Sequence, residues 1–342
     1  MRRYFIPLVV IGFFCWGCSG NGSNDDASSD AKWKDGGIDL FDDGLDGTGD
    51  WDVTDFLEGP PKDTNSCVHP TVNKNCDGEW CVIPGGCFVM GSPTGEVCRE
   101  FDETVHEVTI TRSFKMAATE VTQEKFEEKL GYNNSYNNSP PCPNCPVEEV
   151  NWHEAVAYCN VLSKEGSLEE CYTCVGQKEL VTCVVAPKYG GGKIFNCPGF
   201  RLPTEAEWEY AYRAGTDTAL YNGEITVGCS EADPNADQIA WYSKTAAYKS
   251  HPVGELQPNA WGVHDLAGNV LEHVHDWYHS DLGAGEAINP WGALAPNAEK
   301  HRVIRGGSWI SPVGALRAAR RRTLAIGDAT AHTGFRCIKT LP

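Results

Sequence analysis

The stretch Arg201-Leu-Pro-Thr-Glu-Ala-Glu-Trp-Glu-Tyr210 contains the clearest helix start in the chain. Thr204 follows a proline and precedes Glu207 by three residues, which is the pattern of a capping box, where each side chain accepts a hydrogen bond from a free backbone N–H group. Trp208 and Tyr210 have large rings that favour a buried position. The stretch therefore predicts a capped helix over 204–213 that packs on the domain core.

The remaining elements are short and widely spaced. Apolar residues recur every three or four positions over 121–130 and 152–162, which predicts two further helices. Short strands are expected at 87–90, 105–111 and 303–305. Because neither a linker nor a repeat of 20 to 50 residues interrupts the region, we expect residues 66–342 to form a single, irregular α+β domain with little regular secondary structure.

The N-terminus has the pattern of an export signal. Arg2 and Arg3 precede an apolar run over 4–16, which is too short to span a bilayer as a mature helix. The Gly17-Cys18 junction that follows resembles a bacterial lipoprotein cleavage site, so residues 1–17 are expected to be removed and Cys18 to carry the lipid. Cys15 and Trp16 depart from the usual residues of such sites, and plain secretion is the alternative.

An acidic segment follows this junction. Residues 21–58 hold twelve acidic residues and only two lysines, with few apolar side chains. Such a segment cannot bury enough surface to offset the entropy of ordering, so residues 18–65 are expected to form a flexible stalk. Its aspartates over 39–46 do not complete a calcium-binding EF-hand loop. The formal charge of −19 also argues against nucleic acid as a partner, because such binding depends on Lys and Arg.

The cysteine count points to an oxidising compartment. The chain has sixteen cysteines, and setting Cys15 and Cys18 aside leaves fourteen, enough for seven disulfides. The two Cys-x-x-Cys steps, at 142–145 and 171–174, could instead build a zinc site. We favour disulfides, because the cysteines lie in loop sequence rich in Gly and Pro.

Motifs spread over the whole folded part resemble the formylglycine-generating enzyme, or sulfatase-modifying factor, family. They occur in a fixed order along the chain: Ile83-Pro-Gly-Gly-Cys-Phe-Val-Met-Gly-Ser92, Glu120-Val-Thr122, Pro146-Val-Glu-Glu-Val-Asn-Trp152 with 155–159, 201–210, Pro258-Asn-Ala-Trp-Gly262, Asp265-Leu-Ala-Gly-Asn-Val270, Arg305-Gly-Gly-Ser308 and Gly334-Phe-Arg-Cys337. The resemblance implies a disulfide-rich fold distantly related to C-type lectins. A shared fold does not by itself assign an activity.

The chemistry of that family requires two cysteines that are missing here. Members use them after the Arg-Gly-Gly-Ser motif to bind copper and oxidise a sulfatase cysteine to formylglycine. Ungapped placement of the motif puts Ser311 and Leu316 at those positions, and neither offers the soft thiolate that Cu(I) prefers. Leu271 and His273 also replace the two tryptophans of the family's Trp-Glu-Trp segment. We therefore expect neither copper nor catalytic residues of the family type.

Two other clusters could carry chemistry. Arg317, Arg320, Arg321 and Arg322 could bind carboxylate or phosphate groups, or form structural ion pairs. His273, His275 and His279, with Asp276 between them, could hold iron or zinc. Related non-heme-iron enzymes draw their histidines largely from an additional helical domain, for which this chain has no room.

A calcium site is implied by the resemblance. The family segment that matches 265–272 wraps a calcium ion. Its ligands fall here on the carboxylates of Asp265 and Glu272 and on the backbone carbonyls of Ala267, Gly268 and Val270. Hard oxygen ligands of this kind suit calcium. The alternative is a turn with both acids solvated.

The sequence leaves two hypotheses of function. The favoured one is a non-catalytic domain displayed on the bacterial cell envelope by its lipid anchor, binding an unidentified protein or glycan. The alternative is an oxygen-dependent oxidoreductase, related to the formylglycine-generating or non-heme-iron enzymes, with a divergent site. A secreted or periplasmic location is the alternative to membrane anchoring.

Overall fold

The computed structural model describes residue 67 and residues 69–136 and 139–342. They fall in one compact unit, Asp63–Pro342. The predicted signal peptide, Cys18 and the whole of the predicted stalk lie outside the described residues. Among the helices that are described, none is both long and apolar enough to cross a membrane.

The described region contains the three predicted helices, each begun by a side-chain cap. At α3, Thr204 Oγ1 accepts from the Glu207 N–H at 3.2 Å, and the Glu207 carboxylate accepts from the Thr204 N–H at 2.8 Å. This confirms the predicted capping box. Asn151 and Glu154 form a second one at α2. The helices are α1 (Gln123–Leu130), α2 (Trp152–Glu165), α3 (Glu205–Arg213) and the short α4 (Ala236–Ile239), with 3₁₀ turns at Lys178–Leu180, Pro187–Tyr189, Gly191–Asn196 and Val313–Ala315.

The strands of the described region form four small sheets. The first joins β1 (Trp80–Ile83), β4 (Phe114–Ala117), β13 (Ile338–Thr340) and β7 (Phe200–Arg201) in that order. The second joins β11 (Arg322–Ala325), β10 (His301–Arg305), β8 (Leu271–Trp277) and β12 (Thr333–Gly334). The third joins β2 (Gly86–Met90), β3 (His106–Ile110) and β9 (Ala287–Ile288), and the fourth pairs β5 (Tyr172–Val175) with β6 (Thr182–Val185). The fold is thus the predicted irregular α+β fold.

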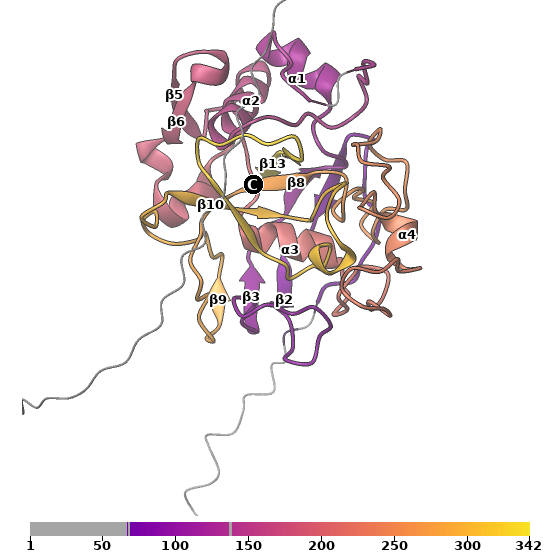
Figure 1. The fold of residues 1–342 in the computed structure, drawn as a ribbon. Coiled ribbons are helices and arrows are strands. Elements are labelled where there is room, and N and C mark those ends of the chain that lie inside the picture. The colour runs from indigo at the N-terminus through magenta and orange to yellow at the C-terminus, as the bar shows by residue number, and fades with distance from the viewer. Residues whose placement is uncertain (1–66, 68, 137–138) are drawn as a thin grey trace, which may run out of the picture. The chain divides into compact units, whose positions relative to one another are not determined.

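The sheets bring distant parts of the chain together. The C-terminal strand β13 lies between β4 and β7, so the end of the domain is held against its beginning. In Figure 1, α1, α2 and the β5–β6 hairpin gather at one end, while β2, β3 and β9 lie at the other, with α3 between them. Strand β8, buried along almost all of its length, pairs with β10 beside α3.

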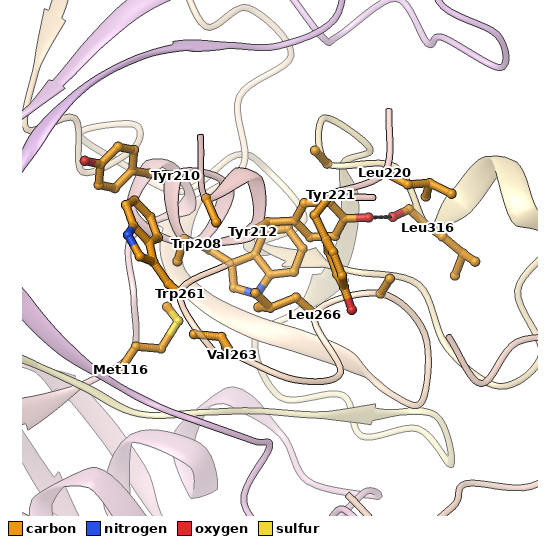
Figure 2. Packing of buried hydrophobic residues seen from close by; sticks show 14 of the residues in the cluster. Met116, Trp208, Tyr210, Tyr212, Leu220, Tyr221, Trp261, Val263, Leu266 and Leu316 are labelled. Carbon is orange, nitrogen blue, oxygen red and sulfur yellow. Dashed lines mark hydrogen bonds between the residues drawn. The ribbon is translucent and has the colours of Figure 1, made fainter. Parts of the chain in front are cut away.

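An aromatic core fills the space around α3. Trp208 and Tyr210 are fully buried, as predicted, and the ring of Tyr210 meets that of Trp261 edge-on at 4.9 Å. Figure 2 shows these rings together with Leu316. The Tyr212 hydroxyl donates to the Leu316 carbonyl at 2.7 Å, which ties the segment after the Arg-Gly-Gly-Ser motif to the helix.

Seven disulfides hold the loops. Each of the fourteen cysteines in the described residues is paired, as the even count predicted. The zinc alternative is wrong, because Cys142 bonds Cys145 while Cys171 and Cys174 take separate partners. The pairs are 67–87, 76–81, 98–229, 142–145, 159–337, 171–197 and 174–183.

Candidate functional site

The Arg-Gly-Gly-Ser motif forms a tight turn after β10. Gly307 has a φ of +75°, and a Cβ atom there would lie 2.8 Å from the Leu316 side chain and 2.9 Å from the Ala315 carbonyl. Only glycine suits such a close approach in the left-handed region. The turn thus brings Ser308 and Ser311 close to the segment that carries Leu316.

Ser311 and Leu316 stand where the resemblance places the family's two cysteines. The Ser308 N–H donates to the Ser311 hydroxyl at 3.0 Å, and the two hydroxyl oxygens lie 3.1 Å apart. The Leu316 side chain is fully buried in the core. No thiolate could arise at this site, because every cysteine among the described residues is in a disulfide.

Aromatic side chains surround the Ser308–Ser311 turn. The rings of Trp241 and His251 stack at 3.8 Å, and Trp309 donates through Nε1 to the Ala331 carbonyl at 3.0 Å. The loop that carries Trp241 contacts the turn, since the Ser243 N–H donates to the Ser311 carbonyl at 3.0 Å. We call Trp241, His251, Trp309 and the neighbouring His332 the aromatic rim.

A cluster of buried acids lies behind this turn, where calcium was predicted. Glu272 does not face a free space: its carboxylate accepts from Arg336 at 2.7 and 2.8 Å and from Trp208 Nε1 at 2.9 Å. Asp265 accepts from the Gly254 N–H at 2.7 Å. The two predicted carboxylate ligands therefore have different surroundings.

Glu120 is a member of this cluster that sequence reasoning did not single out. Its carboxylate accepts from the Asn269 side chain at 3.1 Å and from the Val270 N–H at 3.3 Å, so it contacts the predicted calcium turn directly. Burial raises the pKa of Glu120 well above its ordinary value, and the nearby charge of Asp265 raises it further. The signal was present in the motif Glu120-Val-Thr122.

The turn itself is built from left-handed residues. Asp265, Gly268 and Asn269 have φ values of +58°, +82° and +55°, and a Cβ on Gly268 would lie 2.5 Å from the Trp241 carbonyl. Burial raises the pKa of Asp265 to about 6. No group of three or more His, Cys, Asp or Glu in the described part of the chain is arranged to hold a metal ion, so the carbonyls predicted at Ala267, Gly268 and Val270 would have to supply most of the ligands.

The histidine cluster is not a joint site. His273 is fully buried and hydrogen-bonds to the Val150 carbonyl at 3.0 Å, and burial lowers its pKa to about 4. His275 lies beside the Tyr172 hydroxyl at 3.4 Å. His279 lies near the surface, with its ring against the Asp281 carbonyl. The structure thus places the three imidazoles in three different surroundings.

The arginine cluster consists mostly of structural ion pairs. Arg317 binds Glu103 and Glu96 at 2.7 Å with no exposure of its side chain. Arg321 binds Glu205 through two hydrogen bonds, and Arg320 pairs with Glu100. Arg322 alone of the four is exposed.

These features define a disulfide-linked domain of the formylglycine-generating type. The chain belongs to the family described as "Sulfatase-modifying factor enzyme 1-like domain", whose model matches residues 67–341.

Curated relatives carry diverse names. The chain is 35% identical over 268 residues to a serine/threonine-protein kinase pkn1 of Chlamydia pneumoniae, covering 77% of this chain but 38% of that protein. It is 30% identical to a formylglycine-generating enzyme of Streptomyces coelicolor, covering 75% of this chain and 87% of the enzyme. Among the solved structures, a Treponema denticola variable protein 1 is 29% identical, with a TM-score of 0.64 over 77% of this chain and 95% of that one.

Proposed function

We propose that this protein is a non-catalytic binding module of the bacterial cell envelope, which holds a protein or glycan ligand on the aromatic rim. The observation that carries the proposal is the pair Ser311 and Leu316 at the positions where the resemblance expects thiols. Ser311 hydrogen-bonds within its own turn, and Leu316 is core. The domain retains the family's scaffold without the groups that bind copper.

The aromatic rim supplies a surface suited to binding. Trp241 and His251 stack as a flat pair, and both side chains are partly exposed. Next to Trp309, the Ile310 side chain is 43% exposed. Flat, partly exposed rings favour contacts with sugar faces and with protein side chains, because they present a large apolar area.

The alternative of an oxygen-dependent oxidoreductase has less support. A divergent iron or zinc site would need His273 and His275 of β8 to converge with His279, which follows the strand. Their hydrogen bonds go to three separate partners. No other observation among the described residues favours it.

The compartment follows from the disulfides. Seven disulfides in one domain indicate an oxidising, extracytoplasmic environment. We further propose that the mature chain is anchored to the membrane through lipid on Cys18. Replacement of Cys18 by Ala should release the protein from the membrane fraction or stall the precursor. A variant that is still processed and membrane-bound would contradict the anchor.

Calcium binding is also part of the proposal. The charges of Asp265 and Glu272 raise the pKa of Glu120, and the charge of Glu272 raises that of Asp265. Within the described part of the chain, Arg336 is the one basic residue that is ion-paired with any of the three. We infer that calcium binds at Asp265 and Glu120 with carbonyls of the turn, because a divalent cation would balance the remaining negative charge.

Two measurements test the proposal of a binding module: the formation of formylglycine in a peptide, and the binding of glycans and peptides. The purified mature protein, loaded with copper, is incubated with a Cys-x-Pro-x-Arg sulfatase peptide beside the Streptomyces coelicolor enzyme, and the aldehyde is measured by mass spectrometry. We expect product from the enzyme alone. The same protein is applied to glycan and peptide arrays with Trp241→Ala as the matched variant. Aldehyde above the no-protein control, or array binding that is unchanged in Trp241→Ala, would refute the proposal.

A further inference from the structure

A cavity lies at the C-terminal end of β8, away from the Arg-Gly-Gly-Ser turn. It has a volume of about 400 Å³ and lies between the end of β8, the start of α3 and the loop that leads through β9. Its residue Asp276 follows Leu271, the strand residue nearest the Arg-Gly-Gly-Ser turn, by five positions. At about 3.3 Å per residue this separates the two regions by roughly 16 Å along the strand. The cavity is therefore distinct from the aromatic rim.

Asp276 is the unusual polar group in its lining. Its side chain is only 3% exposed, and one oxygen accepts from the Glu205 N–H, the first of α3, at 2.9 Å. None of the ion pairs within the described residues includes it. Burial raises its pKa well above the ordinary value, and the Glu205 carboxylate adds to this. The surroundings favour a protonated acid, which has an O–H group to donate.

The other buried charged groups of the lining, Glu205 and Arg321, are already paired. Glu205 accepts from Arg321 at 2.7 and 2.9 Å and from Arg305 at 3.0 Å. The remaining terminal nitrogen of Arg321 donates to the carbonyls of Asp102 and His279. Glu205 and Arg321 therefore offer neither a free anion nor a free cation to a ligand. The carboxylate of Asp281, which has no ion-pair partner within the described part of the chain, lies at the exposed edge of the lining.

His106 on β3 supplies a complementary acceptor. Its Nδ1 lies 2.9 Å from the Thr104 carbonyl. A carbonyl only accepts, so Nδ1 carries a hydrogen, and in the neutral form of the ring Nε2 keeps a lone pair. The His106 side chain is buried and lines the same cavity as Asp276. The buried part of the lining thus holds one donor and one acceptor outside the Glu205–Arg321 ion pair.

Apolar groups form most of the remaining wall, among them Met90, Ala206 and Leu282. The loop passes directly over Asp276 at Gly292, where a Cβ would lie 2.7 Å from the Asp276 Cβ at a φ of +90°. Glycine at this point lets the loop close one side of the cavity.

We propose that this cavity binds a small, neutral molecule with an apolar body and a carboxamide or hydroxyl group at one end. The apolar wall takes the body, and the polar end contacts Asp276 or His106. An anion would face the carboxylates of Glu205 and Asp281, and a cation in the buried part of the cavity would have to displace the proton from Asp276. The proposal does not depend on the function of the aromatic rim.

The test uses three probes of similar size and different charge. Benzamide, benzoate and benzylammonium are titrated into the mature protein at neutral pH, with binding followed by NMR. We expect benzamide to bind at least about tenfold more tightly than either ion, because an unmatched buried charge costs more than a matched amide. Equal affinities, tighter binding of either ion, or no binding of benzamide would overturn the proposal.

Variants then locate the probe. Asp276→Asn keeps the shape, the acceptor for the Glu205 N–H and a donor, so it should bind benzamide as the wild type does. Asp276→Leu and His106→Phe should each weaken binding about tenfold, and Ala293→Trp should block the cavity from its half-buried loop. Because Asp276→Asn removes a buried acid and is expected to fold, loss of benzamide binding in that variant would also count against the proposal. Melting curves of each variant check the fold.

Discussion

Two clusters of buried charge in this domain differ in one respect, the ratio of basic to acidic groups. Around α3, the glutamates at 205, 207 and 209 are paired with Arg201, Arg213, Arg305 and Arg321 at 2.6 to 3.0 Å. At the turn before β8, Glu120, Asp265 and Glu272 share the single Arg336. The first cluster has an arginine for every acid, and the second does not.

The consequences appear in the pKa values. Burial alone would raise the pKa of Glu205, but Arg321 and Arg305 together lower it. Burial raises the pKa of Glu120 and Asp265, and the single Arg336 does not offset this. A balanced network acts as scaffold, since its charges are satisfied within the fold. An unbalanced one must take up a proton or a cation, which marks it as a place for regulation or metal binding.

The largest effect is expected from unbalancing the α3 cluster. Arg201 is the ion-pair partner of Glu207 and is fully buried. Arg201→Met should lower the free energy of unfolding by about 3–5 kcal/mol, because it leaves a buried carboxylate without its cation. Urea unfolding of the oxidised protein measures this.

The control is a second substitution in the same pair. Arg201→Met with Glu207→Gln should recover part of the loss, because the buried charge is then gone. The pair of Lys125 and Glu79 is a matched comparison at the surface, because 44% and 69% of these two side chains are accessible. Lys125→Ala should change the free energy of unfolding by less than about 1 kcal/mol. Equal losses from both pairs would show that burial does not set the difference.

Calcium should have a smaller effect, confined to the turn cluster. Binding to the folded state alone stabilises by about 2.7 kcal/mol at a hundredfold excess over the dissociation constant. Thermal unfolding in calcium and in chelator should therefore differ by a few degrees for a domain of this size.

Substitutions in the turn cluster sharpen this measurement. Asp265→Asn keeps the acceptor for the Gly254 N–H and removes one charge, so it should shrink the calcium-dependent shift. Glu272→Gln should shrink it less, because Arg336 already occupies that carboxylate. Identical melting of the wild type in calcium and in chelator would mean that the cluster is balanced by protons alone.

Local features of the fold were predictable from sequence. The capping box of Thr204 and Glu207 involves neighbours along the chain, so sequence shows it directly. Strand β8 was not recognised, because both of its faces are buried and Leu-Glu-His-Val-His-Asp-Trp lacks the alternation of a half-buried strand. Disulfide partners such as Cys159 and Cys337, 178 residues apart, could not be assigned from a count.

Only part of the candidate site could be predicted from the sequence, because its other members are distant along the chain. The turn over 265–272 is one continuous segment, and its residues could be named from their spacing in the family motif. Glu120 contacts Asn269 across 149 residues of sequence, and Arg336 reaches Glu272 from near the C-terminus. These long-range partners decide how much charge the turn carries. Sequence spacing alone could not show that Glu272 is neutralised while Asp265 is not.

The smallest predicted effect is a pH dependence that separates the two clusters. The pKa of Asp265 is raised to about 6 in the folded protein from an ordinary value of 3.8. Between these values the folded state binds more protons than the unfolded state, so stability in chelator should fall as pH rises from 4 to 6, by roughly 1–2 kcal/mol. Since other buried acids such as Asp276 and Glu154 titrate in the same direction, the measured quantity is the difference between wild type and Asp265→Asn. That difference should grow from pH 4 to pH 6 and level off above it. In saturating calcium the slope should reverse, because the metal binds the deprotonated carboxylate. If the difference between wild type and Asp265→Asn does not change with pH in chelator or in calcium, the charge of Asp265 is balanced within the fold, as the charges around α3 are.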